Sequence, residues 1–200
     1  MRWRWRAALG VGAAVAGMTL GTAAAPAGAT TPEVRGQALV GGKPAVNAVV
    51  WLDAPGAPRT LQREKVVLDQ RDLAFSPHVL AVRVGTTVDF PNHDRVFHNV
   101  FSFRDGKVFD LGLYPVGHVK QVTFAKAGLS RLFCNIHPDM SAYVMAVDTP
   151  YFGVSDRQGR FSLTGVPAGT YTYHAWRPGG AEMSGSLVIR PGAPLEVRWP

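Results

Sequence analysis

The chain has 200 residues, a formal net charge of +7 and a single cysteine. One cysteine excludes an internal disulfide, and the lack of a basic run or a nucleic-acid motif argues against a nucleic-acid-binding protein. A chain of this length forms one large domain or two small ones.

The first residues have the features of a secretory signal peptide. A basic start, Met-Arg-Trp-Arg-Trp-Arg, precedes an uncharged run from Ala7 to Leu20 and an alanine-rich end. Such a leader is typically cleaved at a small-x-small site, so we expect residues 1–29 to be removed after Ala29, or alternatively after Ala25. Three arginines leave with it, which lowers the formal charge from +7 to +4. An uncleaved N-terminal anchor is the alternative; otherwise we expect a periplasmic or secreted bacterial protein without a membrane span.

The remaining chain has the pattern of an all-β protein. No long stretch has apolar residues at helical spacing, whereas short alternating runs such as 119–124 are separated by Gly, Pro, Asn and Asp turns. These patterns predict β-strands packed as a sandwich. We expect strands at 34–40, 47–52, 66–69, 78–84, 87–90, 98–102, 119–124, 130–134 and 143–147.

The most informative stretch is Leu132-Phe-Cys-Asn-Ile-His-Pro-Asp-Met-Ser-Ala-Tyr143. Cys134, His137 and Met140 form the pattern C-x2-H-x2-M and offer a thiolate, an imidazole and a thioether, which are donors that suit copper. Pro138 prevents a helix here, so we expect the donors on a short loop between two strands. A free thiol in an oxidising compartment is best explained by metal ligation.

A copper site of this kind needs a second imidazole, which must come from elsewhere in the chain. His98 lies within an apolar run and has the surroundings of a buried ligand. His93 lies between Asn92 and Asp94 in a turn-like cluster and is expected to be an exposed loop residue.

Residues from about 65 to 147 resemble the cupredoxins, the type 1 (blue) copper domains, with amicyanin and plastocyanin most similar. The resemblance is carried by Phe75-Ser-Pro-x-x-Leu-x-Val, Asn92-His-Asp-x-x-x-His-Asn-Val, Gly128 and the Cys134 loop. It implies one type 1 copper ion with His98, Cys134, His137 and Met140 as ligands, although a backbone carbonyl could replace Met140. It also implies that Asn99 ties the ligand loops together and donates a hydrogen bond toward the thiolate. Aromatic residues are expected to wrap the site: Phe97, Phe101, Phe133 and Tyr143.

The end of the chain resembles a second family. Asp156 to Tyr173 is similar to the carboxypeptidase-regulatory-like domain, a small transthyretin-like sandwich, but the opening strands of that family match Val34 to Val50. We therefore expect residues 34–54 and 152–200 to form this smaller sandwich, with a Greek-key cupredoxin sandwich at 60–150 inserted between them. Two separate modules, in which 34–52 belong to the copper sandwich, are the alternative. Insertion at a loop is tolerated where the ends of the inserted domain lie close together.

These features indicate electron transfer rather than catalysis. Four protein ligands leave no open position for a substrate, and the chain has no catalytic motif of the hydrolase or zinc-peptidase type. The resemblance to amicyanin implies a dehydrogenase or a c-type cytochrome as redox partner. A copper storage, delivery or resistance module, and an adhesion or assembly protein with incidental copper, are the alternatives.

Overall fold

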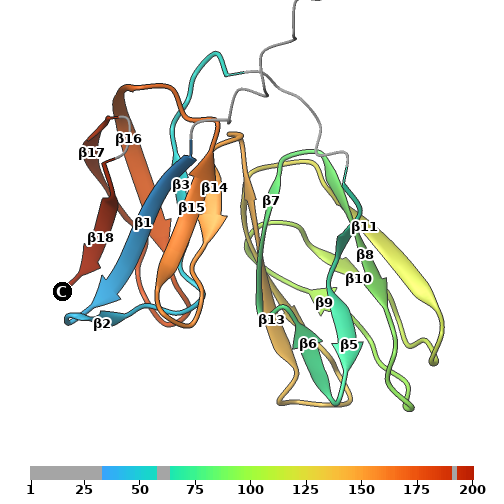
Figure 1. Cartoon of the computed structure of the whole chain (residues 1–200). Coiled ribbons are helices and arrows are strands. Elements are labelled where there is room, and N and C mark those ends of the chain that lie inside the picture. The colour runs from blue at the N-terminus through green and yellow to red at the C-terminus, as the bar shows by residue number, and fades with distance from the viewer. Residues whose placement is uncertain (1–32, 58–63, 191–192) are drawn as a thin grey trace, which may run out of the picture. The chain divides into compact units, whose positions relative to one another are not determined.

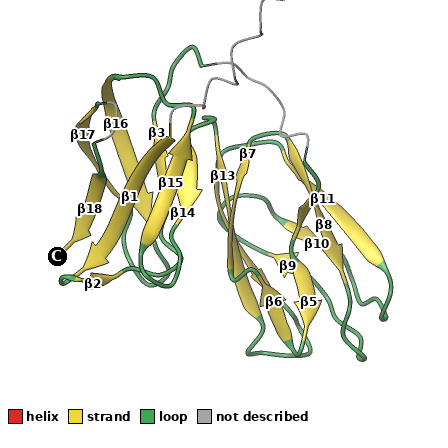
Figure 2. Ribbon diagram, viewed as in Figure 1, coloured by secondary structure: helices red, strands yellow, loops and turns green. Residues whose placement is uncertain are grey.

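Every regular element in the described part of the chain is a β-strand. The computed structural model describes residues 33–57, 64–190 and 193–200, and Figure 2 shows strands and loops but no helix among them. The all-β prediction is therefore confirmed. Among the same residues there is accordingly no helix that could cross a membrane. The predicted signal peptide, residues 1–29, lies outside the described residues.

Two sheets combine strands from the beginning and the end of the described chain. In the first, β1 lies between β15, which is antiparallel to it, and β18, which is parallel; β2 also pairs with β1 (Figure 1). The second sheet has the order β14-β3-β16-β17. The strands are β1 (Glu33–Val40), β2 (Lys43–Pro44), β3 (Val49–Leu52), β14 (Phe152–Val154), β15 (Arg160–Thr164), β16 (Gly169–Trp176), β17 (Met183–Ile189) and β18 (Leu195–Trp199).

Alternating side chains of these strands form one apolar core. Ala38, Leu52, Leu163 and Val197 are fully buried and belong to one cluster, as expected for strands that turn every second side chain inward. Segments 33–52 and 152–199 thus contribute strands to the same two sheets. The likeness of this sandwich to the carboxypeptidase-regulatory-like domain stays a prediction.

The residues between these two segments form separate sheets. One has the order β10-β9-β12-β13-β7, the second β11-β8-β4, and β5 and β6 form a hairpin. The strands are β4 (Val66–Val67), β5 (Asp69–Arg71), β6 (Ala74–Ser76), β7 (Val79–Arg83), β8 (Thr86–Pro91), β9 (Phe101–Ser102), β10 (Phe109–Asp110), β11 (Val119–Phe124), β12 (Gly128–Phe133) and β13 (Ser141–Val147). Their shared core includes Val88, Phe90, Leu132 and Val144.

The structure differs from the predicted strands near His98. The strand expected at 98–102 begins only at Phe101, and His98 makes an isolated bridge with Tyr114 instead. The preceding residues are held in a turn because the Asn92 side-chain amide donates to the Val96 carbonyl. His98 is therefore positioned by a turn and a bridge rather than by a regular strand.

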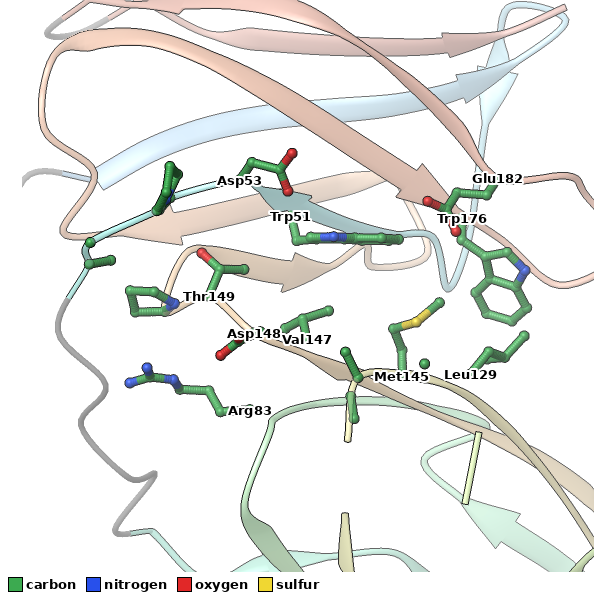
Figure 3. A pocket seen from close by; sticks show the side chains of 18 residues that line it. Trp51, Asp53, Arg83, Leu129, Met145, Val147, Asp148, Thr149, Trp176 and Glu182 are labelled. Carbon is green, nitrogen blue, oxygen red and sulfur yellow. The ribbon is translucent and has the colours of Figure 1, made fainter. Parts of the chain in front are cut away.

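A third buried cluster contains side chains from both groups of sheets. Trp176 of β16 packs with Val79 of β7 and Met145 of β13, and the Trp176 and Tyr143 rings lie 5.1 Å apart. Beside this cluster is a cleft of about 700 Å³, lined by Trp51, Met145 and Trp176, with carboxylates at its edges (Figure 3).

Candidate metal centre

Cys134, His137 and Met140 lie on the short loop that joins β12 to β13, as the sequence predicts. The loop is closed by two backbone hydrogen bonds, from Cys134 N to the Met140 carbonyl (3.3 Å) and from Met140 N to the His137 carbonyl (3.0 Å). Because β12 and β13 pair directly up to Phe133 and Ser141, the loop has little freedom to open.

The buried His98 imidazole meets this loop. His98 Nδ1 lies 3.0 Å from His137 Nδ1, which lies 3.6 Å from Cys134 Sγ. The donor atoms of the three residues all lie within 4.8 Å of one another. Among the described residues, these three form the group of His, Cys, Asp or Glu side chains that is close enough to hold one metal ion. His98 and Cys134 are buried, whereas His137 is half-buried, so part of the His137 imidazole faces the surface.

These separations fit a shared metal ion. Bonds of about 2.0 Å to nitrogen and about 2.3 Å to sulfur, at angles near those of a trigonal or tetrahedral site, separate the donor atoms by roughly 3–4 Å. Two imidazoles and one thiolate are the equatorial donors of a type 1 copper site. The His98–Cys134–His137 group thus fits such a site.

Met140 ends the ligand loop and is buried. Its side chain is only 1% exposed and belongs to the same buried cluster as Cys134. Its role as axial ligand stays a prediction.

Tyr114 holds the backbone of His98 in place. His98 N donates to the Tyr114 carbonyl (3.2 Å) and Tyr114 N donates to the His98 carbonyl (2.9 Å). The Tyr114 hydroxyl donates to the Phe90 carbonyl (3.0 Å), and burial raises the pKa of Tyr114 to about 12. The phenol therefore stays neutral and anchors this bridge in the core.

Asp94 fixes the His98 ring and was not predicted from the sequence. Its Oδ2 lies 3.0 Å from His98 Nε2 and accepts a hydrogen bond from Leu73 N (2.8 Å). The Leu73 N–H, followed by the His98 ring, lowers the pKa of Asp94 to about 2. Because a carboxylate accepts hydrogen bonds, the proton of the neutral His98 ring lies on Nε2. Nδ1, which faces His137, is then the nitrogen that can bind a metal ion. The signal that could have found it is the i, i+4 spacing of Asp94 and His98.

Asn99 contacts the Cys134 sulfur through its backbone. Asn99 N donates to Cys134 Sγ at 3.5 Å, while the side-chain Nδ2 donates to Asp110 Oδ1 at 2.9 Å. The expected hydrogen bond toward sulfur is therefore present, and it comes from the main chain.

The expectation that four aromatic residues wrap the site is wrong for at least two of them. Phe97 is 54% exposed, and Tyr143 packs against Trp176 on the other face of its sheet. Phe97 follows an exposed turn, and the alternation of β13 turns Tyr143 away from the buried Ala142 and Val144. The buried residues in the cluster around Cys134 and Met140 include Leu132 and Tyr114 instead.

The other histidines lie outside this cluster. His93 is exposed and its Nδ1 contacts Asp69 (2.8 Å), and His78 contacts the Ser141 carbonyl (3.1 Å). His174 lies between Asp53 and Glu182.

Fold and site together describe an all-β protein with a largely buried His–Cys–His group that fits a type 1 copper site. No protein-family model and no curated protein matches the sequence. Solved structures to which the chain is similar include a purple cupredoxin from Nitrosopumilus maritimus, with 26% identity over 42% of this chain and 100% of that chain (TM-score 0.39). Another is the copper-containing nitrite reductase NirK from Thermus scotoductus SA-01, with 27% identity over 49% of this chain and 25% of that chain (TM-score 0.42). A third is amicyanin from Paracoccus versutus, with 22% identity over 49% of this chain and 97% of that chain (TM-score 0.39).

Proposed function

We propose that this is a periplasmic or secreted type 1 copper protein that carries single electrons between redox partners and is not an enzyme. The observation that supports this most directly is the meeting of His98, Cys134 and His137 within 4.8 Å, with His98 and Cys134 buried. Bound by these residues and Met140, copper would supply a one-electron couple between Cu(II) and Cu(I).

The protein's own residues favour transfer of an electron without a large change of geometry. The Asp94 carboxylate orients the His98 ring, and the backbone bonds of the Cys134 loop limit how far its donors can move. Preorganised ligands of this kind hold one arrangement for both oxidation states.

The surface next to His137 is suited to a transient partner. Ile136 is 46% exposed and precedes His137, and Phe97 and Leu113 are 54% and 50% exposed beside the His98–Tyr114 bridge. Exposed apolar side chains in one region are typical of protein-interaction sites. We propose that a c-type cytochrome or a dehydrogenase docks here and exchanges its electron through the edge of His137.

The copper site is tested by visible and EPR spectra of the Cu(II)-loaded protein and its Cys134→Ser variant. We expect a strong thiolate-to-copper charge-transfer band in the wild-type protein that is absent in the variant, because serine supplies no thiolate. His98→Ala should lose the band too, whereas the matched control His78→Ala, an exposed histidine, should keep it. A wild-type protein without the band would refute the type 1 site.

Electron transfer is tested separately by voltammetry and by mixing the reduced protein with oxidised cytochrome c. A reversible couple and rapid oxidation support a carrier. Binding of Cu(I) alone, with no reversible couple, would instead support storage or delivery.

A further inference from the structure

The chain makes an irregular return beside the candidate metal centre, between β10 and Tyr114. Asp110 pairs with Phe101, and Leu111 N donates to the Val100 carbonyl (3.0 Å). Tyr114 then bridges His98. Between these two paired positions, Asn99 on one side thus opposes two residues, Gly112 and Leu113, on the other, which is the arrangement of a β-bulge.

Asp110 holds this bulge in shape. Its Oδ1 accepts a hydrogen bond from Gly112 N at 2.8 Å, closing a turn two residues long. Gly112 has a φ of +65°, which glycine adopts at little cost. The extra residue allows Tyr114 to reach His98, so the geometry of one ligand depends on this turn.

The same carboxylate oxygen holds the side chain of Asn99. Asn99 Nδ2 donates to Asp110 Oδ1 at 2.9 Å, and Asn99 is 1% exposed. Its Oδ1 is buried and has no hydrogen-bond partner within the described structure. Because a carboxylate only accepts hydrogen bonds, this contact fixes which end of the amide faces Asp110.

Asn99 in turn contacts the sulfur of Cys134. Its backbone N–H points at Sγ from 3.5 Å. The exposed carboxylate of Asp110 therefore holds the buried side chain of Asn99, and the backbone N–H of Asn99 contacts the Cys134 sulfur. The Gly112 N–H and then the Asn99 amide lower the pKa of Asp110, so the carboxylate is ionised at neutral pH.

We propose that Asp110 is a positioning residue of the metal centre: it holds Asn99 so that the backbone N–H of Asn99 stays directed at the Cys134 sulfur. The proposal rests on the proposed function only where it concerns the copper potential, because the hydrogen bonds belong to the protein itself.

Asp110 then affects the potential in two opposite directions. Its negative charge favours Cu(II) over Cu(I) and lowers the potential. The N–H dipole that it holds against the sulfur favours Cu(I) and raises the potential, since hydrogen bonds to the Cys sulfur tune such sites.

Two variants separate these effects. Asp110→Asn removes the charge but keeps a side-chain oxygen that accepts from Asn99 and Gly112, whereas Asp110→Ala removes both. Asp105→Asn is the charge control, because Asp105 is an exposed acid in the preceding loop that pairs with Arg131 rather than Asn99.

The first measurement is amide hydrogen exchange in the metal-free protein. Exchange at Asn99, relative to Val144 in the middle of β13, should be about tenfold faster in Asp110→Ala, the factor expected for loss of one hydrogen bond to a charged group. It should be unchanged in Asp110→Asn and Asp105→Asn. Exchange at Asn99 that is unaffected in Asp110→Ala would overturn the proposal.

The second measurement is the reduction potential of the copper-loaded proteins. The potential of Asp110→Ala should lie below that of Asp110→Asn, since both lack the charge and only the former lacks the anchor. Equal potentials would overturn the role assigned to the N–H. If the wild-type protein shows no blue band at all, the proposed function fails, while hydrogen exchange still decides whether Asp110 positions Asn99.

Discussion

Asp94 connects the buried imidazole of His98 to a different hairpin of the protein. Its carboxylate accepts from Leu73 N in the β5–β6 turn and from Arg95 N, and it contacts His98 Nε2. The folded-state pKa of about 2 lies below the ordinary value of 3.8. A carboxyl with a lowered pKa stabilises the fold above its unfolded-state pKa and loses that contribution as the pH falls toward the folded-state pKa.

We therefore expect Asp94→Asn to lower the free energy of unfolding of the metal-free protein, by roughly 1–3 kcal/mol above pH 5. The difference from wild type should shrink between about pH 4 and pH 2, because the wild-type carboxyl is then protonated as well. Chemical denaturation from pH 2 to 7 measures this, with Asp139→Asn, an exposed acid of the ligand loop, as control. A difference that is independent of pH would contradict the assignment.

At this scale the sequence predicted the donors but not the residues that orient them. His98, Cys134 and His137 could be placed together because motif spacing and the apolar surroundings of His98 are local features; their role as ligands stays a prediction. Asp94 and Asp110 act through hydrogen bonds to Leu73 and Asn99, which depend on where the β5–β6 turn and the β10 return lie in the folded chain. The i, i+4 spacing of Asp94 and His98 is a local signal, but local sequence carries no information on the distant contacts with Leu73 and between Asp110 and Asn99.

Among the elements, β12 leads directly into the ligand loop and is fixed by its buried side chains. Leu132 is fully buried two residues before Cys134. We expect Leu132→Ala to lower stability by about 2–5 kcal/mol, because the removed side chain leaves a cavity. Leu113→Ala, at a position that is 50% exposed, should change stability little. Urea denaturation of the metal-free proteins measures both, and equal losses would contradict the importance of the β12 core.

β1 is the central strand of its sheet and needs a glycine where its neighbours approach. A Cβ added at Gly36 would lie 2.3 Å from Phe161 Cζ and 2.7 Å from the Leu195 carbonyl oxygen. Since the carbonyl belongs to the backbone of β18, the clash cannot be relieved by a side chain alone. We expect Gly36→Ala to cost about 1–3 kcal/mol.

The matched control for this substitution is Gly169→Ala in β16. There the added Cβ has its nearest contact at 3.4 Å, with the Tyr171 ring. Thermal unfolding followed by circular dichroism should show a clear loss for Gly36→Ala and little change for Gly169→Ala. A Gly36→Ala protein as stable as wild type would show that β1 and β18 can separate without cost.

Two of the longer strands, β1 and β11, could be predicted from alternation, whereas three of the short ones, β5, β6 and β10, could not. The alternation of 34–40 and 119–124 is strong enough to predict β1 and β11, which have 8 and 6 residues. β5, β6 and β10 have only three, three and two residues, too few for a periodic pattern to develop. They form because hairpin and bulge geometry brings their backbones together.

For the molecule as a whole, the question is whether the two groups of sheets unfold together. The described residues belong to one compact unit, and Trp176 is 7% exposed within a cluster that includes Val79 and Met145. Burial of a tryptophan against another group of sheets contributes several kcal/mol. We therefore expect this contact to couple the unfolding of the two groups of sheets.

We expect the wild-type protein to show one calorimetric transition. Added copper should move this whole transition to higher temperature, because a ligand that binds only the native state stabilises every part of the protein that unfolds together with its site. In Trp176→Ala the transition should divide in two, and copper should then raise only the transition of residues 66–147, which contain the ligands. Trp176→Phe keeps an aromatic ring against Tyr143 and should retain a single transition. A Trp176→Ala protein that still unfolds in one copper-dependent step would mean that the remaining contacts of the cluster, Met145 and Val79 among them, suffice to couple the sheets.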